Sequence, residues 1–126
     1  MTDGQVRLLS GRMGERLAAW FLERRGYRVR ERNARVGRFE VDLVVERGGW
    51  LVFVEVKRRS GAAWERAAFA LGSAQRRRLA AAAEAYAARE GLERAVRFDV
   101  VTVDEEAHRL TIEHYPDAFG GAGEVR

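Results

Sequence analysis

The sequence has no cysteine, and among its 126 residues it has only one proline and two histidines. Without cysteine, a disulfide framework, a thiolate metal site and a thiol nucleophile are all excluded. No apolar run reaches the length of a membrane span, and Met1 to Arg7 lack the apolar region of a secretory signal. We therefore expect a single intracellular domain, in the cytoplasm, without membrane contact.

Lysine is almost absent, because Lys57 is the only lysine among 23 basic residues and the others are arginines. A lysine ammonium is compact and its pKa shifts readily, whereas an arginine guanidinium is planar and stays charged. The isolated lysine indicates chemistry that arginine cannot perform. The chance survival of one lysine would explain the same count.

Two further absences limit the kinds of active site that the chain could form. The sequence has no glycine-rich loop of the kind that cradles phosphates, since Gly48-Gly49 suits a hairpin turn and Gly120-Gly121 lies near the C-terminus. The histidines, His108 and His114, both fall in the last expected hairpin, and we interpret them as surface residues rather than ligands. A nucleotide hydrolase and a histidine-based site are thereby disfavoured.

The positive charge is unevenly distributed. The formal net charge is +4, and the segment from Met1 to Arg38 carries ten arginines against four acids. A second basic run, Arg76 to Arg78, opens an alanine-rich segment. This distribution suggests a polyanionic partner such as nucleic acid. A solvated arginine-rich surface is the alternative interpretation.

The first part of the chain predicts a helix followed by a strand. Ser10 is placed to cap a helix that runs to about Arg25, and Tyr27 to Arg32 alternate in the manner of a strand. We expect a polar connection over residues 33–38. The expected core stripe of the helix consists of Met13, Leu17, Trp20 and Phe21.

Two strong strand patterns, Phe39 to Glu46 and Trp50 to Lys57, flank Gly48-Gly49 and predict a hairpin with a two-residue turn. Positions whose numbers sum to 97 then lie opposite each other, which pairs Asp42 with Glu55. The expected core face of this hairpin consists of Val41, Leu43, Val45, Val52, Val54 and Val56.

The second half predicts one long helix and another hairpin. Ser73 can cap a helix over Ala74 to Glu90, and the hairpin joins Val96 to Val103 with Leu110 to Tyr115. Residues 60–72 form an expected loop or short helix, and 1–9 and 117–126 are expected flexible tails of a single domain spanning 1–126. The order α-β-β-β-α-β-β predicts an α/β (α+β) fold, a mixed sheet flanked by helices.

A carboxylate pair and the isolated lysine share one end of the first hairpin. Like charges opposite each other repel, so Asp42 facing Glu55 is unfavourable unless a divalent cation lies between them. Lys57 follows Glu55 by two residues and shares its face. These three groups suit phosphodiester hydrolysis. The alternative is a surface hairpin in which Glu40 pairs with Lys57 and Asp42 is solvated.

The motifs of this chain resemble those of the bacterial YraN family, which is assigned to the restriction-endonuclease-like PD-(D/E)XK superfamily and is similar to archaeal Holliday-junction resolvases. The resemblance covers about Gly11 to Phe119. It is carried by Gly14-Glu15, Gly26-Tyr27, Asn33, Glu40-Val41-Asp42-Leu43, Phe53-Val54-Glu55-Val56-Lys57, Arg77-Arg78-Leu79 and Arg97-Phe98-Asp99-Val100.

The resemblance implies a restriction-endonuclease-like fold and a Mg²⁺- or Mn²⁺-dependent endonuclease acting on DNA, including branched DNA. Lys57 would be the catalytic lysine, and a homodimer would serve to cut two strands. The implied metal ligands, which are also catalytic, are Asp42, Glu55, the Val56 backbone carbonyl and Glu15. The implied nucleic-acid-binding residues are Arg35, Arg38, Arg58, Gln75, Arg76 and Arg77.

The chain departs from the family pattern at three positions. Val41 replaces the proline that names the superfamily, Phe39 stands where the family usually has glycine, and Gln75-Arg76 stands where it tends to have lysine. None of these changes removes an implied metal ligand, so they put substrate handling in doubt more than catalysis.

Two other functions remain open at this point. The chain could be a non-catalytic nucleic-acid-binding module on the same fold, since a basic surface does not require an active centre. It could also be a subunit that contacts a protein partner through Trp64, Phe69 and Tyr115.

Overall fold

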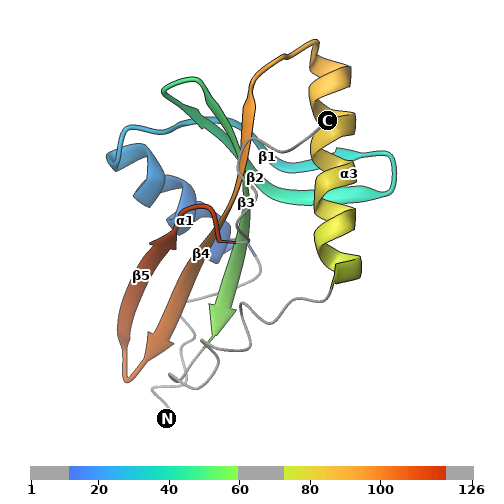
Figure 1. The fold of residues 1–126 in the computed structure, drawn as a ribbon. Helices are drawn as coiled ribbons and strands as arrows, with labels where there is room; N and C mark the ends of the chain where they lie inside the picture. The colour runs from blue at the N-terminus through green and yellow to red at the C-terminus, as the bar shows by residue number, and fades with distance from the viewer. Residues whose placement is uncertain (1–11, 60–72, 119–126) are drawn as a thin grey trace.

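The computed structural model describes residues 12–59 and 73–118, which form two helices and a five-stranded sheet (Figure 1). The predicted order α-β-β-β-α-β-β is confirmed. Trp64, Phe69 and the segment 60–72 lie outside the described residues, as does Ser10. The elements are α1 (Met13–Arg24), β1 (Arg28–Val36), β2 (Phe39–Arg47), β3 (Trp50–Arg59), α3 (Ser73–Glu90), β4 (Ala95–Glu106) and β5 (Arg109–Tyr115).

The strands lie in sequence order, β1-β2-β3-β4-β5. Strands β1, β2 and β3 are antiparallel neighbours, β4 runs parallel to β3, and β5 returns antiparallel to β4. The parallel pair requires a crossover, and α3 lies in that connection. The sheet is therefore mixed, as the sequence predicted.

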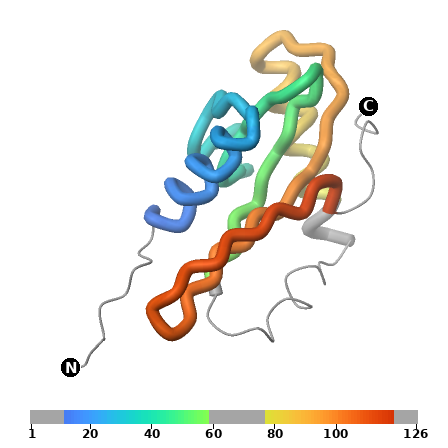
Figure 2. Tube along the Cα trace, turned by 90° about the vertical axis from the view of Figure 1, so that its left-hand side faces the viewer, coloured from blue at the N-terminus to red at the C-terminus, as the bar shows by residue number. Residues whose placement is uncertain are grey.

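The two helices cover opposite faces of the sheet (Figures 1 and 2). On one face, Ala18, Ala19 and Leu22 of α1 pack on aliphatic residues of β2, β3 and β4. On the other face, Ala82, Ala83 and Tyr86 of α3 pack against a second cluster that includes Phe53 and Val96. Burial of these two apolar layers is the main force holding the domain together. Among the described helices, none is long and apolar enough to cross a membrane.

The predicted core stripe of α1 is wrong in two of its four positions. Trp20 is 52% exposed and Met13 is 37% exposed, whereas Leu17 and Phe21 are half-buried. The helix instead turns the face of Gly14, Ala18, Ala19 and Leu22 to the sheet, and the three small residues allow a close approach. The helix begins at Met13, and Arg12 at its N-cap makes no side-chain capping hydrogen bond.

Gly14 is a point of close approach between α1 and β3. A Cβ atom placed on Gly14 would overlap Cγ and Cδ of Arg58. The aliphatic part of Arg58 therefore crosses α1 where only glycine leaves room. This contact fixes the first turn of α1, which carries Glu15, against the end of β3.

The β1–β2 hairpin is longer than the sequence indicated. Strand β1 continues through residues 33–36, so the predicted polar connection there is wrong. Asn33 has a φ of 49°, and Val41 and Val44 belong to the same core cluster although they are three residues apart. Strict alternation would put them on opposite faces. The face changes between these two valines, and Val41 does not share the cluster of Leu43 and Val45 as predicted.

His114 is buried, not a surface residue as predicted. Its side chain is 3% exposed, and Nε2 lies 2.6 Å from Oδ2 of the fully buried Asp99. The same carboxylate accepts two 2.8 Å hydrogen bonds from Arg97, which also donates to the Tyr27 hydroxyl. The backbone amide of Asp117 also donates to Asp99, so the start of the predicted C-terminal tail is tied to β4.

Candidate functional site

The β2–β3 hairpin places the predicted site residues. Gly48 and Gly49 both have positive φ, 56° and 87°, and close the two-residue turn. The predicted register is confirmed from Arg47–Trp50 to Leu43–Val54. Beyond that point the ladder stops, so the predicted Asp42–Glu55 pair is not a ladder pair.

The side chain of Asp42 replaces the backbone hydrogen bond that the β2–β3 ladder lacks at this position. Its Oδ2 accepts a 2.8 Å hydrogen bond from the Val56 backbone amide. The two strands thus separate at their far end while a side chain still joins them. This geometry fixes the Asp42 carboxylate beside Val56, whose carbonyl is one of the predicted ligands.

Asp42 is half-buried and surrounded by other acids. Burial and the charges of Glu55, Glu15 and Glu40 together raise the pKa of Asp42 to about 6, against the lowering effect of the Val56 hydrogen bond. The structure therefore brings Glu15 of α1 within electrostatic range of Asp42. This is a site of concentrated negative charge, and ionised Asp42 is costly there unless a cation is present.

Glu55 and Lys57 form an ion pair beside Asp42. Lys57 Nζ lies 3.2 Å from Glu55 Oε2, and the two side chains are 19% and 23% exposed. The alternative Glu40–Lys57 pair does not form; Glu40 lies 3.8 Å from Arg35 instead. The single lysine is thus held in a partly buried, acidic setting.

The donor set fits a hard divalent cation only in part. Mg²⁺ usually binds one or two carboxylates, with waters and phosphate oxygens completing its shell. Asp42 and Glu55 meet that description, since both offer carboxylate oxygens. Over the described ranges, however, no group of three or more histidine and acidic residues is placed to hold a metal ion. Glu15 is close enough to act on Asp42 electrostatically and is not part of such a group.

A hollow of about 260 Å³ opens beside Glu55, between α3 and the surface formed by the β1–β2 turn, β2 and β3. Two arginines, two acids and three apolar residues line it. They include the predicted Arg38 and Arg78, the neighbour of the predicted Arg77 in the same basic run. The hollow is lined by Arg38, Phe39, Glu40, Glu55, Arg78, Leu79 and Ala82.

The predicted nucleic-acid-binding residues come from β1, the β1–β2 turn, the end of β3 and the start of α3. Arg35, Arg38 and Arg77 are exposed. Arg58 is exposed as well, but its stem packs over Gly14 at the α1 contact. The side chains of Gln75 and Arg76 lie outside the described part of the chain.

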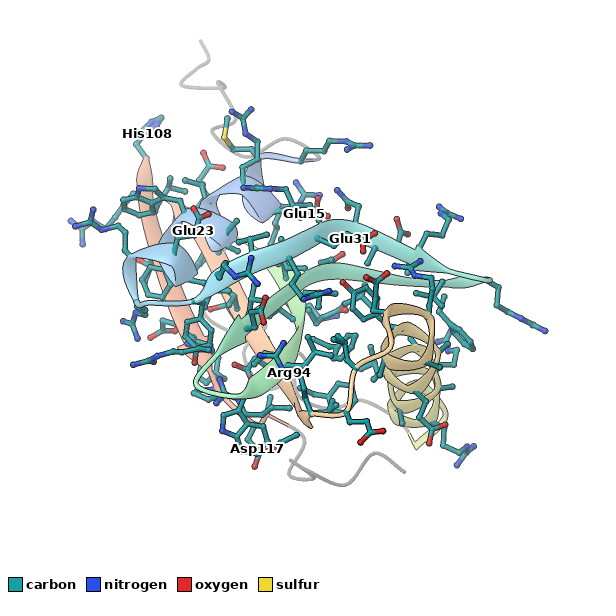
Figure 3. All side chains as sticks on the ribbon, turned by 90° about the horizontal axis from the view of Figure 1, so that it is seen from above. Glu15, Glu23, Glu31, Arg94, His108 and Asp117 are labelled. Carbon is teal, nitrogen blue, oxygen red and sulfur yellow. The ribbon has the colours of Figure 1, made fainter. Side chains whose placement is uncertain are left out.

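Sequence reasoning missed two polar groups on the face of Lys57. Thr102 lies opposite Lys57 in the parallel β3–β4 ladder, and Asp104 follows it by two residues. Thr102 Oγ1 and Asp104 Oδ1 are buried, and neither has a hydrogen-bond partner among the described residues. No motif marked them, because only the register of β4 against β3 brings them next to Lys57. His108, by contrast, projects from the tip of the β4–β5 hairpin, apart from Glu15 (Figure 3).

The chain matches proteins of one family along most of its length. It is 46% identical to a UPF0102 protein of Anaeromyxobacter dehalogenans over 122 residues, which is 96% of this chain and 91% of that protein. A UPF0102 protein of Syntrophotalea carbinolica is 40% identical over 90% of this chain and 93% of its own length. One of Myxococcus xanthus is 41% identical over 86% and 87%.

The family model for "Uncharacterised protein family UPF0102" matches residues 14–103, which run from the close-packed glycine of α1 into β4. The match includes Glu15, Asp42, Glu55 and Lys57, and it confirms the family that the motifs predicted. The chain belongs to the UPF0102 (YraN) family.

Proposed function

We propose that this protein is a divalent-cation-dependent endonuclease that hydrolyses phosphodiester bonds of DNA. The observation that carries the proposal is the meeting of Asp42, held by the Val56 amide, with the Glu55–Lys57 ion pair at the open end of the β2–β3 hairpin. The family and the α+β fold are compatible with this restriction-endonuclease-like function.

The acids would hold Mg²⁺ or Mn²⁺. Asp42 and Glu55 supply carboxylate oxygens, the Val56 carbonyl lies on the same strand segment, and Glu15 would act from α1 through water. When bound, such a cation neutralises charge on the phosphate and lowers the pKa of a water molecule. The raised pKa of Asp42 supports this role, because a carboxylate that is costly to ionise alone gains most from a cation.

Lys57 would orient the attacking water and stabilise the phosphate. In the structure its ammonium neutralises Glu55 at 3.2 Å. Engagement of Glu55 elsewhere would release the ammonium to a phosphate oxygen within reach of the same side chain. An arginine could not replace Lys57 easily, since a planar guanidinium group requires more room than a compact ammonium group.

The arginines that line the hollow would hold the nucleic-acid backbone. Arg38 comes from the β1–β2 turn and Arg78 from α3, and both line the hollow that Glu55 borders. Contacts between arginine and phosphate give salt-dependent affinity without sequence readout. We therefore expect a structure-selective enzyme rather than a sequence-specific one.

The test is cleavage of a labelled panel of duplex, single strand, flap, four-way junction and RNA, with Mg²⁺, Mn²⁺ or EDTA. Lys57→Ala should abolish cleavage and leave binding nearly intact. Arg109→Ala, which removes an exposed cation at the start of β5, is the matched control and should cleave normally. Equal activity of Lys57→Ala and wild type would refute the assignment.

A non-catalytic nucleic-acid-binding module is the second candidate. The observation that favours it is the lack of a three-ligand group among the described acids and histidines. Binding of the panel without cleavage under any metal condition, and with equal affinity in EDTA, would support this alternative.

A further inference from the structure

The outer face of α1 has an exposed aromatic residue that the proposed chemistry does not use. Trp20 is 52% exposed, and Met13 is 37% exposed. Among described residues, the only other large hydrophobic side chain so exposed is Leu110. Leaving a tryptophan ring in water forgoes the stabilisation that burial would give, so a ring in this position requires an explanation.

Arginines surround this ring. Met13, Arg16, Trp20 and Arg24 follow one another by three, four and four residues, which places them in a single stripe on the helix. The Arg24 guanidinium lies 5.3 Å from the Trp20 ring centroid. This cation–π contact still leaves Trp20 half exposed to water.

The charge of this face favours an anionic occupant. Arg16 and Arg24 lie about 6 Å from Trp20 along the helix axis, one on each side. Arg12 adds positive charge at the start of the helix, and all three arginines are exposed. Glu23 is the one exposed acid of α1, because Glu15 is half-buried.

A second copy of the chain would be a poor occupant of the same face. A two-fold dimer brings identical patches together, so these arginines would meet their own copies. The apolar part of the patch is also small, because only Met13 and Trp20 contribute large exposed hydrophobic groups.

We propose that the outer face of α1 binds unpaired nucleotides, with one base stacked on Trp20 and the flanking phosphates held by Arg16 and Arg24. Aromatic rings with neighbouring cations bind single strands in this way, since each base offers a flat face and each phosphate a charge. A base inside a duplex has both sides of its ring covered by neighbouring bases. The outer face of α1 therefore selects single-stranded or splayed nucleic acid.

This inference rests on the proposed function and narrows its substrate. Glu15, in the first turn of α1, is within electrostatic range of Asp42, and Trp20 lies about 7.5 Å further along the helix axis. Trp20 points outward whereas Glu15 is half-buried. A strand leaving the candidate site would thus pass the N-terminal end of α1 to reach Trp20, which suits a substrate with an unpaired arm beside a duplex.

The experiment measures binding by fluorescence anisotropy in EDTA, in a Lys57→Ala background, so that cleavage does not intervene. The probes are an oligonucleotide single strand, a forked duplex with unpaired arms and a blunt duplex. Trp20→Ala should weaken binding of the single strand and the fork about 5- to 100-fold, while the blunt duplex changes less than about twofold. Trp20→Phe keeps a stacking ring and should restore most of the affinity.

Leu110→Ala is the matched control, since it removes an exposed side chain of similar character from β5 and should leave all three affinities unchanged. Unchanged single-strand affinity in Trp20→Ala, an equal loss on all three probes, or a change of oligomeric state in sedimentation would overturn the inference. So would the absence of any binding by the parent protein.

The failure of this inference is distinguishable from that of the proposed function. Cleavage by the wild type, together with unchanged single-strand affinity in Trp20→Ala, would refute the stacking surface alone. Trp20-dependent binding without cleavage under any metal condition would uphold the surface and refute the enzyme.

Discussion

Asp42 Oδ2 accepts a hydrogen bond from the Val56 amide at 2.8 Å, at the point where the β2–β3 ladder has ended. The bond holds a carboxylate among Glu55, Glu15 and Glu40, where burial and like charges raise its pKa to about 6. A single side chain therefore both joins the strands and carries a charge that the isolated fold disfavours. This conflict is typical of functional sites, and it makes the stability of the protein sensitive to pH.

Asp42→Asn should stabilise the cation-free protein at neutral pH. The pKa of Asp42 rises from 3.8 to about 6 on folding, and a shift of about two units corresponds to about 3 kcal/mol. Partial exposure reduces this to about 1–3 kcal/mol. The stability that protonated Asp42 provides is complete below pH ~4 and is lost as the pH rises through ~6.

Urea denaturation in EDTA measures this difference. The free energies of unfolding of Asp42→Asn and wild type should converge near pH 4 and differ most above pH 7. The asparagine can still accept the Val56 hydrogen bond, so a general loss of structure is not expected. A variant less stable than wild type at pH 7.5 would contradict the electrostatic account.

Asp99→Asn should have the opposite effect. Burial alone would raise the pKa of Asp99, but hydrogen bonds from His114, Arg97 and the Asp117 amide lower it. A lowered pKa gives stability that is present above the unfolded-state pKa and lost as the pH falls through the folded-state value. Removing this charge leaves Arg97 poorly paired in the interior, at a cost of about 3–5 kcal/mol near pH 7.

Thermal and urea denaturation of Asp104→Asn provide the control for that loss. Asp104 is on the same strand as Asp99, yet its buried Oδ1 has no hydrogen-bond partner within the described part of the chain, so an amide there should cost less than about 1 kcal/mol. Equal losses in the two variants would mean that the Arg97–Asp99–His114 contacts are not the source of the stabilisation.

How far the sequence predicted these features depends on how local each one is. The register of the β2–β3 hairpin follows from Gly48-Gly49, because two adjacent glycines select a two-residue turn and alternation sets the rest. Asp42, Glu55 and Lys57 could be placed at one end of it for that reason. The alternation of side chains could not predict the irregular backbone near Asn33 and Asp42. Val41 consequently packs in the core cluster under α3, not in the cluster of Leu43 and Val45.

The contacts between residues far apart in the chain could not be predicted from the sequence. Helical spacing of large apolar residues assigned Met13 and Trp20 to the core, but α1 turns the face of Gly14, Ala18, Ala19 and Leu22 to the sheet, and Arg58 of β3 packs over Gly14. The burial of His114 likewise depends on Asp99, which lies on the neighbouring strand. Neither contact has a periodic signal in the chain.

Gly14→Ala should test the close approach of α1 to β3. Alanine in a helix interior is ordinarily more stable than glycine by up to about 1 kcal/mol. Here the new Cβ would overlap the stem of Arg58, so the single variant should be less stable than wild type by about 1–2 kcal/mol. In an Arg58→Ala background the same substitution should become neutral or stabilising, as measured by a double-mutant cycle in urea. Additive effects would show that the two side chains do not compete for this space.

Titration with Mg²⁺ or Mn²⁺ should separate binding from catalysis. A ligand that binds only the folded state raises its stability, by about 2.7 kcal/mol at one hundred times Kd. The melting temperature of the wild type should therefore rise with the cation, and Asp42→Asn and Glu55→Gln should respond much less. Lys57→Ala should bind the cation several-fold more tightly than wild type, because it removes a positive charge 3.2 Å from Glu55. The same variant should not cleave nucleic acid. A Lys57→Ala protein that bound the cation as weakly as Glu55→Gln would indicate that Lys57 supports the site structurally, and the catalytic role proposed for its ammonium would lose its basis.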